Sequence, residues 1–303
     1  EIFRYVKAMK QQMPLNSHNF KYLINPTSVC EGSVFLHIYV HSAPDHYKQR
    51  TAIRETWGSP RNFPDLAIKV VFLMGRPNKQ SVQEALQLES DTHGDIVQED
   101  FVDSYRNLTY KAIEGLKWIS HNCRHATFIL KTDDDIFVNI FNLVKHLRSL
   151  HKFRKGNVNR LLLCLVWQRM KVIRNPKSKW YIPKSEFPDD FFPTYCSGSA
   201  YIMSADVVEA MYNVSLKTPF FWVDDFYITG LLAGKLNLQH EKFNSVYKLG
   251  PSKFLEEFTE PNKWRTLVFG HVHNLNNMHT VWKNILREQH NSIEPKSTVA
   301  APV

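Results

Sequence analysis

The stretch FILKTDDDIFVN, residues 128–139, decides the fold class of this chain. Its first part is short and apolar, which predicts a strand buried in a sheet. Its middle places Asp133, Asp134 and Asp135 in a row at the far end of that strand. Adjacent carboxylates repel one another, so such a cluster needs a compensating positive charge. The chain carries a net charge of +9, yet it concentrates negative charge at this position.

Predicted strands and helices alternate on both sides of this stretch. On its N-terminal side, strands are predicted at residues 34–40 and 68–74, and helices at residues 50–57, 81–88 and 108–119. On its C-terminal side a helical apolar stripe runs from Ile140 to Leu150, and Asn139 is placed to cap it. This alternation predicts an α/β fold with a mostly parallel sheet and helices on both faces. Ligands bind at the carboxyl ends of the strands in such sheets, and the aspartates lie at such an end.

Residues 160–204 differ from the rest in being richer in aromatic residues and proline. They contain strand-like segments at residues 161–166 and 200–203, which we interpret as an antiparallel extension over the same site and not as a separate domain. The predicted organisation is an N-terminal arm at residues 1–30, one α/β domain at residues 31–289 and a flexible tail at residues 290–303.

Composition restricts the class of protein. The 38 lysines and arginines outnumber the 29 aspartates and glutamates, but they form no basic run, so nucleic acid is not expected as a partner. The positive balance better suits a small anion, such as a nucleotide or a phosphate ester. No apolar stretch of about 18 residues occurs, so no segment is expected to span a membrane. The chain begins at Glu1, so we expect a processed or truncated N-terminus.

The three aspartates allow two interpretations. In an extended chain Asp133 and Asp135 point to one side and Asp134 to the other. Two carboxylates on one side can bind a hard divalent cation, Mg²⁺ or Mn²⁺, and leave positions open for phosphate oxygens. Alternatively, the cluster is a polar turn in which an aspartate caps the next helix. The position directly after a strand favours the metal site.

A second carboxylate pair, Asp224 and Asp225, stands in the sequence WVDDFYITG at residues 222–230. If a helix begins here, these residues cap its N-terminus. A carboxylate in the same place, beside aromatic residues, can equally take a proton from a hydroxyl group as a general base. The pair by itself leaves both roles open.

Six motifs of this chain occur in the order found in one family of enzymes. They are RTAIRETW at 50–57, EDFVDSYRNLT at 99–109, KTDDD at 131–135, SKWY at 178–181, YCSG at 195–198 and Asp224-Asp225. The series resembles the inverting β-1,3-galactosyltransferase and β-1,3-N-acetylglucosaminyltransferase family from residue 31 to residue 287. The resemblance implies a GT-A (Rossmann-like) fold, a UDP-sugar donor and Mn²⁺, with Mg²⁺ as a substitute. It also implies a type II membrane protein of the Golgi lumen, with its anchor N-terminal to this chain.

The resemblance assigns roles to individual residues. Asp225 is implied as the catalytic base, and Asp135 and His271 as the Mn²⁺ ligands, although His273 competes for the histidine assignment and a surface role is open for either. The residues implied on the nucleotide and donor side are Arg50, Arg54, Lys111, Asp133, Asp134 and Asp224. An arginine-rich first helix can equally be a solvated face, so the two arginines have that alternative role.

Three further residues are implied in the acceptor or sugar pocket: Lys179, Trp180 and Gly198. A core aromatic is the alternative for Trp180. The chain also departs from the family, which more often has Glu-Asp where this sequence has Asp224-Asp225. The shorter neighbour at position 224 is expected to change which sugar is held, and not the chemistry.

The four cysteines allow three disulfide connectivities. The resemblance implies the pairs Cys30–Cys123 and Cys164–Cys196. The first two cysteines each precede a predicted strand, so they would lie at the same edge of a parallel sheet, where a bridge can form. Two glycosylation sequons are present, at Asn107 and Asn213. Asn107 lies within a family motif, so Asn213 is the better glycan candidate.

The expected activity is transfer of galactose from UDP-galactose to the 3-hydroxyl of a glycan acceptor on a glycolipid, glycoprotein or proteoglycan. A β-1,3-N-acetylglucosaminyltransferase that uses UDP-GlcNAc is the alternative, because pocket shape alone distinguishes one acetamido group. A catalytically inactive carbohydrate- or nucleotide-binding protein on the same scaffold is disfavoured by the presence of both Asp135 and Asp225. A metal-dependent nucleotidyl or phosphoryl transferase is disfavoured because no GxxxxGK[ST] loop occurs.

Overall fold

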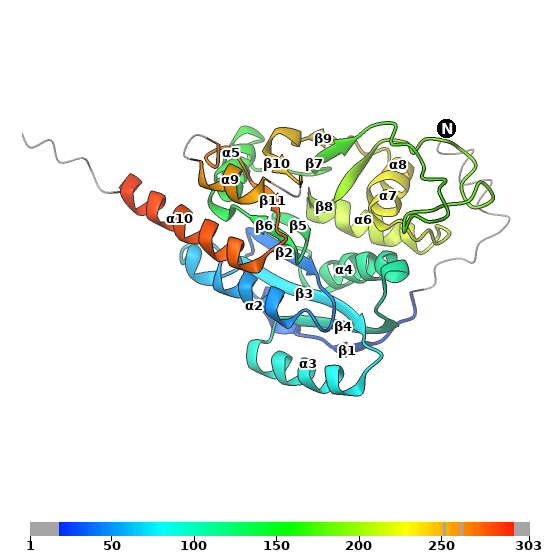
Figure 1. Cartoon of the computed structure of the whole chain (residues 1–303), viewed down its shortest axis with the longest axis horizontal. Coiled ribbons are helices and arrows are strands. Elements are labelled where there is room, and N and C mark those ends of the chain that lie inside the picture. The colour runs from blue at the N-terminus through cyan, green and yellow to red at the C-terminus, as the bar shows by residue number, and fades with distance from the viewer. Residues whose placement is uncertain (1–17, 251–252, 261–262, 294–303) are drawn as a thin grey trace, which may run out of the picture.

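The computed structural model of the chain describes residues 18–250, 253–260 and 263–293. The main sheet of this part has eight strands in the order β1-β4-β3-β2-β5-β8-β7-β9 (Figure 1). In chain order they are β1 (Tyr22–Ile24), β2 (Leu36–His41), β3 (Ile68–Arg76), β4 (Ile96–Val102), β5 (Phe128–Asp133), β7 (Leu162–Trp167), β8 (Tyr195–Met203) and β9 (Glu241–Lys242). Strands β4, β3, β2 and β5 run parallel to their neighbours within this group, which confirms the predicted mostly parallel sheet.

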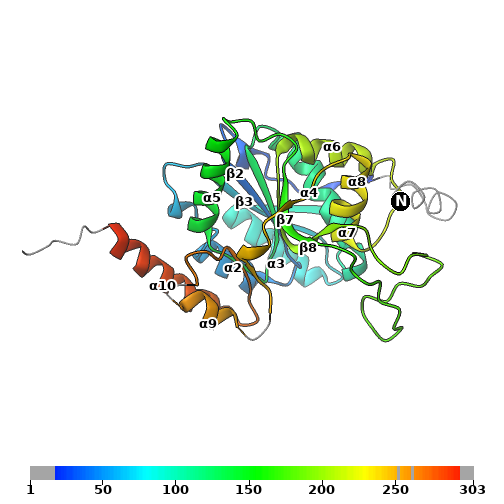
Figure 2. The same ribbon diagram turned by 90° about the horizontal axis from the view of Figure 1, so that it is seen from above.

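Helices cover both faces of this sheet (Figure 2). They are α2 (Tyr47–Glu55), α3 (Gln80–His93), α4 (Leu108–Asn122), α5 (Ile140–Phe153), α6 (Ala205–Ser215), α7 (Asp224–Phe226), α8 (Ala233–Lys235), α9 (Phe254–Thr259) and α10 (Leu275–Ile293), with short helices η1 (Thr27–Cys30), η2 (Pro60–Asn62), η3 (Tyr105–Asn107), η4 (Tyr227–Leu232) and η5 (Asn244–Val246). Val71 and Leu73 of β3 pack in the same core as α4 and α6, whereas Phe72 and Met74 pack with α2, α5 and α10. Successive residues of a strand face opposite sides, so β3 contributes to both cores.

Local sequence signals mark several element boundaries, of which the cap at Asn139 was predicted. The Asn139 side chain accepts a hydrogen bond from the Asn142 amide and so caps α5. Helix α3 ends at Gly94, whose φ of 64° is the left-handed conformation that glycine adopts without steric cost. Strand β2 is buried along its whole length, as its apolar sequence indicates.

The antiparallel extension is also confirmed. Strand β8 pairs antiparallel with β5, and β7 pairs antiparallel with β8. The loop between β7 and β8, residues 168–194, extends outward from the body of the molecule (Figure 2). The extension therefore continues the main sheet and does not form a second domain.

A second, three-stranded sheet lies next to the carboxyl end of β5. It contains β6 (Ile136–Val138), β10 (Tyr247–Lys248) and β11 (Phe269–His271) in the order β10-β11-β6. Strand β11 runs antiparallel to β6 with His271 opposite Ile136. This register brings His271 beside the residue that precedes β6, which is Asp135.

Both implied disulfides are present. Cys30 and Cys123 are bridged with their Cα atoms 5.4 Å apart, and Cys164 and Cys196 with theirs 5.7 Å apart. The first bridge ties η1 to the end of α4, and the second joins the neighbouring strands β7 and β8. Each Cα separation lies within the usual range for a disulfide.

The predicted chain ends need correction. Strand β1 pairs with β4, so the last part of the predicted arm, residues 1–30, belongs to the sheet. Helix α10 continues to Ile293, so the predicted tail does not begin at residue 290. The buried residues Met278, Val281 and Ile285 anchor this helix on the core, which explains why it persists. Residues 1–17 and 294–303 lie outside the described residues. Within the described part, no helix combines the length and apolarity that crossing a bilayer requires.

Candidate active site

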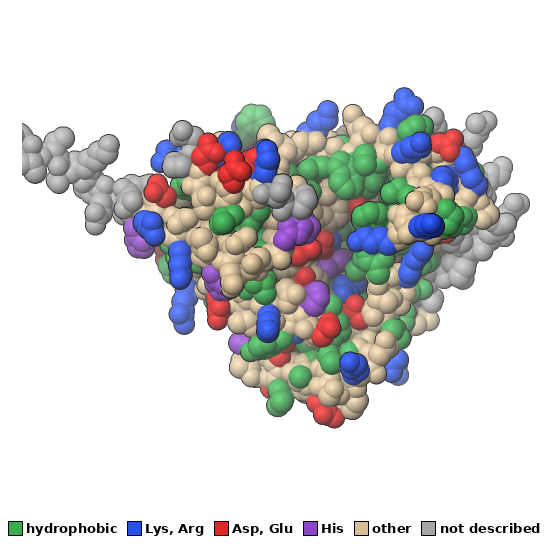
Figure 3. Space-filling model, viewed as in Figure 1, with side chains coloured by type: hydrophobic (Ala, Val, Ile, Leu, Met, Phe, Trp, Pro, Cys, Tyr) green, Lys and Arg blue, Asp and Glu red, His purple; other side chains and the backbone are tan. Residues whose placement is uncertain are grey.

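A cleft of about 1060 Å³ opens at the carboxyl ends of β2 and β5. Acidic and histidine side chains gather in this hollow (Figure 3). The predicted site residues that line it are Lys111, Asp133, Asp134, Asp135, Trp180, Gly198, Asp224, Asp225 and His271. The fold thus brings together residues from β5, β8, α4, α7, β11 and the loop before β8.

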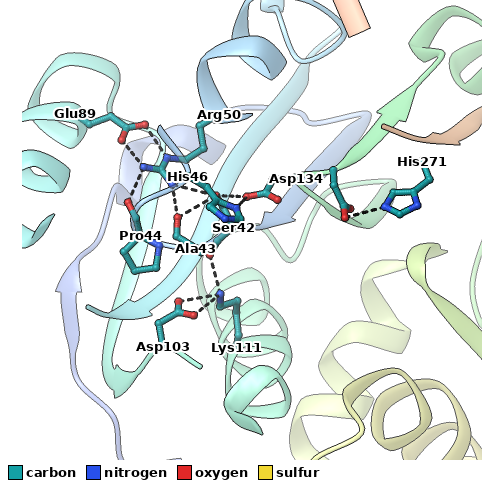
Figure 4. Close-up of polar contacts among 11 residues, drawn as sticks. Ser42, Ala43, Pro44, His46, Arg50, Glu89, Asp103, Lys111, Asp134 and His271 are labelled. Atoms are coloured by element: carbon teal, nitrogen blue, oxygen red, sulfur yellow. Dashed lines mark hydrogen bonds and ion pairs between the residues drawn. The ribbon is translucent and has the colours of Figure 1, made fainter. Parts of the chain in front are cut away.

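The three consecutive aspartates have three different sets of partners. Asp133 Oδ1 accepts a hydrogen bond from Lys131 Nζ at 2.6 Å. Asp134 Oδ2 lies 2.7 Å from Ser42 Oγ and 2.8 Å from His46 Nδ1, and Figure 4 shows Asp134 turned toward both. Asp135 Oδ2 lies 3.1 Å from His271 Nε2. The cluster is therefore not compensated by one charge, because its three carboxylates contact four different neighbours, Lys131, Ser42, His46 and His271.

Asp135 and His271 are the pair best suited to hold a metal ion. Both side chains are partly exposed in the cleft, and each offers an oxygen or nitrogen ligand of the type that Mn²⁺ accepts. Burial, the largest single effect, acts to raise the pKa of Asp135, but the hydrogen bond with His271 and the charges of His271 and Lys131 together lower that pKa below its usual value. The same hydrogen bond raises the pKa of His271. Two protein ligands leave coordination positions for oxygens of a phosphate and of water.

The competing histidine, His273, does not line the cleft. Its ring lies 4.3 Å from that of His271, centroid to centroid, but the contact with Asp135 is made by His271.

Asp134 is 6% exposed, and one of its oxygens already accepts hydrogen bonds from Ser42 and His46. These contacts make Asp134 a support for the loop that follows β2.

Asp225 lies in the first turn of α7 and lines the cleft. Its Oδ1 accepts a hydrogen bond from the Phe226 amide at 2.7 Å, so it makes the local contact expected at a helix start. Burial, and next the charge of Asp224, raise the pKa of Asp225 to about 7. A carboxyl group with that pKa can accept and release a proton near neutral pH. The N-cap residue of α7 is Val223 and no side chain caps this helix, so the capping alternative for the pair is wrong, while the general-base role stays a prediction.

Gly198 of β8 allows Asp225 to approach the strand. A Cβ atom at position 198 would lie 3.2 Å from Asp225 Cβ and 3.4 Å from its Oδ2. A side chain here would press against the carboxyl group. The structure thus gives Gly198 a steric role beside Asp225, whereas its place in the acceptor or sugar pocket stays a prediction.

Lys131 had no role assigned from the sequence, although it lines the cleft. Its side chain is 1% exposed, and its ammonium group donates to Asp133 and to the carbonyl oxygen of Gly198. The available signal was its position two residues before Asp133, because residues i and i+2 of a strand share a face.

Arg50 and Arg54 do not line the cleft, so the expected donor contacts need correction. Arg50 is 1% exposed and donates to both carboxylate oxygens of Glu89 and to the carbonyl oxygens of Ala43 and Pro44 (Figure 4). Arg54 forms ion pairs with Glu89 and Asp95. The alternative of a solvated arginine face is wrong as well, because buried carboxylates bind both side chains.

Lys111 lies at the wall of the cleft and is 3% exposed. Its ammonium group donates to the Ser42 carbonyl oxygen at 2.7 Å and pairs with Asp103 at 2.9 Å. The sequence analysis assigned a role to Lys111, but not to its partners Ser42 and Asp103 or to His46, which line the same cleft. Ser42 and Asp103 directly follow β2 and β4, and His46 precedes α2. Asp103 lies within the motif at 99–109, but no local pattern distinguishes Ser42 and His46 from ordinary loop residues.

Trp180 lies on the opposite rim of the cleft and is 48% exposed, which excludes the alternative of a core aromatic. The Lys179 ammonium group lies 4.5 Å from the Trp180 ring and 5.4 Å from the Tyr105 ring, measured to the ring centroids. Lys179 itself is not a lining residue and contacts the aromatic rim. This rim offers exposed ring faces beside Asp224 and Asp225.

The two sequons differ in their surroundings. Asn107 is partly buried, and its side-chain amide donates to the Val102 carbonyl oxygen at 2.8 Å. Asn213 is exposed on α6. The accessible side chain is therefore that of Asn213.

The sheet order and the acidic cleft at its carboxyl edge agree with the GT-A fold. The chain belongs to the Galactosyltransferase family, since residues 48–244 match the sequence model of that family. Beta-1,3-galactosyltransferase 1 of Homo sapiens and of Mus musculus are each 35% identical to the chain over 282 residues, which is 91% of this chain and 82% of the relative. Beta-1,3-galactosyltransferase 5 of Pan paniscus is 35% identical over 241 residues, 79% of this chain and 78% of the relative.

Solved structures of glycosyltransferases also align with the chain. One is the galactosyltransferase LgtC in complex with donor and acceptor sugar analogues, with a TM-score of 0.41, 10% identity and coverage of 82% of this chain and 95% of that chain. Another is a glycosyltransferase involved in glycosylation of the major capsid of PBCV-1, with a TM-score of 0.44, 8% identity and coverage of 82% and 98%.

Proposed function

We propose that this chain is an inverting β-1,3-galactosyltransferase that moves galactose from UDP-galactose to the 3-hydroxyl group of a glycan acceptor. The observation that carries the proposal is that Asp225 and the Asp135–His271 pair line one cleft. Galactose is the proposed sugar because the similar proteins are named as β-1,3-galactosyltransferases. The acceptor is a glycan carried by a glycolipid, a glycoprotein or a proteoglycan.

The donor site is proposed to lie around the acidic turn after β5. Asp135 and His271 would hold Mn²⁺, or Mg²⁺ in its place, and the ion when bound would neutralise charge on the diphosphate of UDP. Lys111 adds a fixed positive charge to the same wall. Asp134 acts through the loop that carries Ser42 and His46, which it holds by two hydrogen bonds. Asp133 and Asp224 complete the donor side.

The chemical step is proposed as one displacement with Asp225 as the base. The acceptor 3-hydroxyl oxygen bonds to the anomeric carbon while the bond from that carbon to the phosphate oxygen breaks. The hydroxyl proton passes to the Asp225 carboxylate, and UDP leaves with the electron pair of the broken bond. Attack from the side opposite UDP inverts the anomeric configuration. Asp225 suits this role because its pKa of about 7 lets it accept the proton near neutral pH.

The aromatic rim is proposed as the acceptor side of the cleft. Trp180 is half exposed there, and Tyr105 and Trp222 line the cleft with it. An aromatic face offers a large, rigid apolar surface for the apolar face of a sugar ring. Lys179 lies against both the Trp180 and Tyr105 rings and so orients them.

The proposed compartment is the Golgi lumen. All four cysteines are paired in disulfides, which form and persist in oxidising compartments such as the secretory pathway. The exposed Asn213 sequon is the proposed glycan site.

The proposal is tested by assaying the chain with Mn²⁺ and three donors, UDP-galactose, UDP-GlcNAc and UDP-glucose, against glycosides of several terminal sugars. The expected product is a β-1,3-linked galactoside, with its linkage and anomeric configuration determined by NMR. Transfer from UDP-GlcNAc alone would support the N-acetylglucosaminyltransferase alternative. Binding of UDP-sugars without transfer or UDP release would indicate an inactive binding protein.

A further inference from the structure

Lys131 is a buried cation that lies among the acidic side chains lining the cleft. Its ammonium group donates to Asp133 Oδ1 at 2.6 Å and to the carbonyl oxygen of Gly198. The side chain is 1% exposed, so the charge is almost fully removed from water. Such burial is costly unless the charge is paired and hydrogen-bonded. The acidic surroundings of Lys131 compensate for it.

The contacts of Lys131 connect the donor side of the cleft to the general base. Asp133 is the last residue of β5, and Gly198 belongs to the neighbouring strand β8. Asp225 lies against Gly198, because a Cβ atom on that glycine would be 3.2 Å from Asp225 Cβ. The lysine therefore ties the end of β5 to the backbone on which Asp225 rests.

The charged and titratable groups around Asp225 come from several elements. Asp224 is adjacent on α7, Lys131 acts from β5, Tyr195 belongs to β8 and Tyr105 to η3. The backbone amides of Phe226 and Gly198 also donate to Asp225. Burial and the Asp224 charge oppose ionisation of Asp225, whereas the Lys131 charge favours it. With a neutral side chain at position 131, burial and the Asp224 charge would raise the pKa of Asp225 further, because the opposing charge of Lys131 would be absent.

We propose that Lys131 is a positioning residue of this active site, whose buried charge favours the ionised form of Asp225 and whose hydrogen bonds fix β8 beneath it. This inference rests on the proposed function of Asp225 as the base. Lys131 acts through Asp225, Asp133 and Gly198, and it transfers no proton in the reaction.

The test is the pH dependence of kcat at saturating donor and acceptor. Lys131→Met has similar length and no charge, so the acid limb should move to higher pH by about one to three units, the effect of a neighbouring opposite charge on a carboxylate. Activity should recover as the pH rises. Lys131→Arg keeps the charge and should keep the limb at its wild-type position, with a lower maximal kcat. Lys131→Gln keeps a donor for the Gly198 carbonyl but lacks the charge, so its limb should move as that of Lys131→Met does.

Lys117→Met is the matched control. Lys117 pairs with the buried Glu99 at 2.5 Å and lies over the Tyr22 ring, and it does not line the cleft. The substitution removes a largely buried lysine charge outside the cleft. It should therefore lower thermal stability without moving the acid limb of the pH dependence of kcat.

The outcomes separate this inference from the proposed function. If Asp225→Asn loses turnover but the limbs of Lys131→Met and Lys131→Gln stay in place, the inference is overturned and Asp225 remains the base. Should Asp225→Asn keep turnover, the proposed base role itself fails. If thermal unfolding finds the neutral variants unfolded, Lys131→Arg decides, because a shifted limb in this charged variant contradicts the inference and an unshifted limb supports it.

Discussion

Asp135 and His271 are 136 residues apart in the chain, yet Asp135 Oδ2 lies 3.1 Å from His271 Nε2. The contact arises because β6 begins directly after Asp135 and pairs with β11, with Ile136 opposite His271. The pairing of β6 with β11 thus brings the two proposed metal ligands together. His273 lies two residues beyond the end of β11 and does not make this contact, which makes it a natural comparison.

We expect Asp135→Ala and His271→Ala to weaken Mn²⁺-dependent UDP binding, because each removes one of two protein ligands. The loss should exceed the roughly 10–100-fold that removal of an outer-shell partner causes. Isothermal titration calorimetry with UDP, in the presence and absence of Mn²⁺, measures it. His273→Ala is the control and should bind as the unchanged chain does. Retention of Mn²⁺-dependent UDP affinity in Asp135→Ala would refute the ligand assignment.

We expect Asp225→Asn to stabilise the fold at alkaline pH. The folded state raises the pKa of Asp225 to about 7 from its ordinary value of 3.8, mainly through burial. The unfolded chain loses this proton first, so the carboxyl group lowers the free energy of unfolding as the pH rises from 3.8 to 7. Asparagine can still accept the hydrogen bond from the Phe226 amide and has no charge to bury.

The stability difference is measured by thermal unfolding. At pH 8, Asp225→Asn should have the higher Tm, by roughly 2–4 °C for each kcal/mol gained. At pH 4 the two proteins should unfold at similar temperatures. An equal Tm at both pH values would mean that Asp225 is not held in an unfavourable ionised state.

We expect Arg50→Met to destabilise the fold by about 3–5 kcal/mol, because it leaves Glu89 buried with part of its compensating charge removed. It also releases the carbonyl oxygens of Ala43 and Pro44 in the loop beside the cleft. Chemical denaturation measures the change. Lys184→Met is the control, because Lys184 pairs with Asp190 on the exposed surface and its loss should have no measurable effect. Equal stability of the two variants would contradict the structural role of Arg50.

We expect Gly198→Ala to reduce kcat while leaving UDP affinity near its original value. The added Cβ would lie 3.2 Å from Asp225 Cβ, so the carboxyl group must shift. The required shift is a few tenths of an ångström. A displacement of 1 Å from the reactive geometry can reduce a rate by about 100-fold, so the loss for this smaller shift should lie below that. Steady-state kinetics and UDP titration separate the two effects. Gly250→Ala is the control, since nothing lies within 4 Å of a Cβ at that position. If Gly198→Ala has full kcat, contact with Gly198 does not position the base.

Local sequence patterns determined the main elements. Apolar runs and helical stripes predicted β2, β3, β5, α4 and α5, and Asn139 marked the start of α5. Alternation of strands and helices predicted the parallel sheet and placed the aspartates at its carboxyl edge. These features depend on residues within a few positions of one another, so they can be recognised from one sequence. The N-terminal end of the domain was less certain, since β1 forms by pairing with the distant strand β4.

Only the tertiary structure decided how the charged side chains pair. The family resemblance made Arg50 a candidate donor contact, but the fold buries it against Glu89, 39 residues away. Lys131 gained a role only when β8 brought Gly198, 67 residues away, beside its ammonium group. The sequence states which charges exist and where strands end. Strand order and register decide which charges meet, because a buried charge is stable only beside partners that distant segments supply.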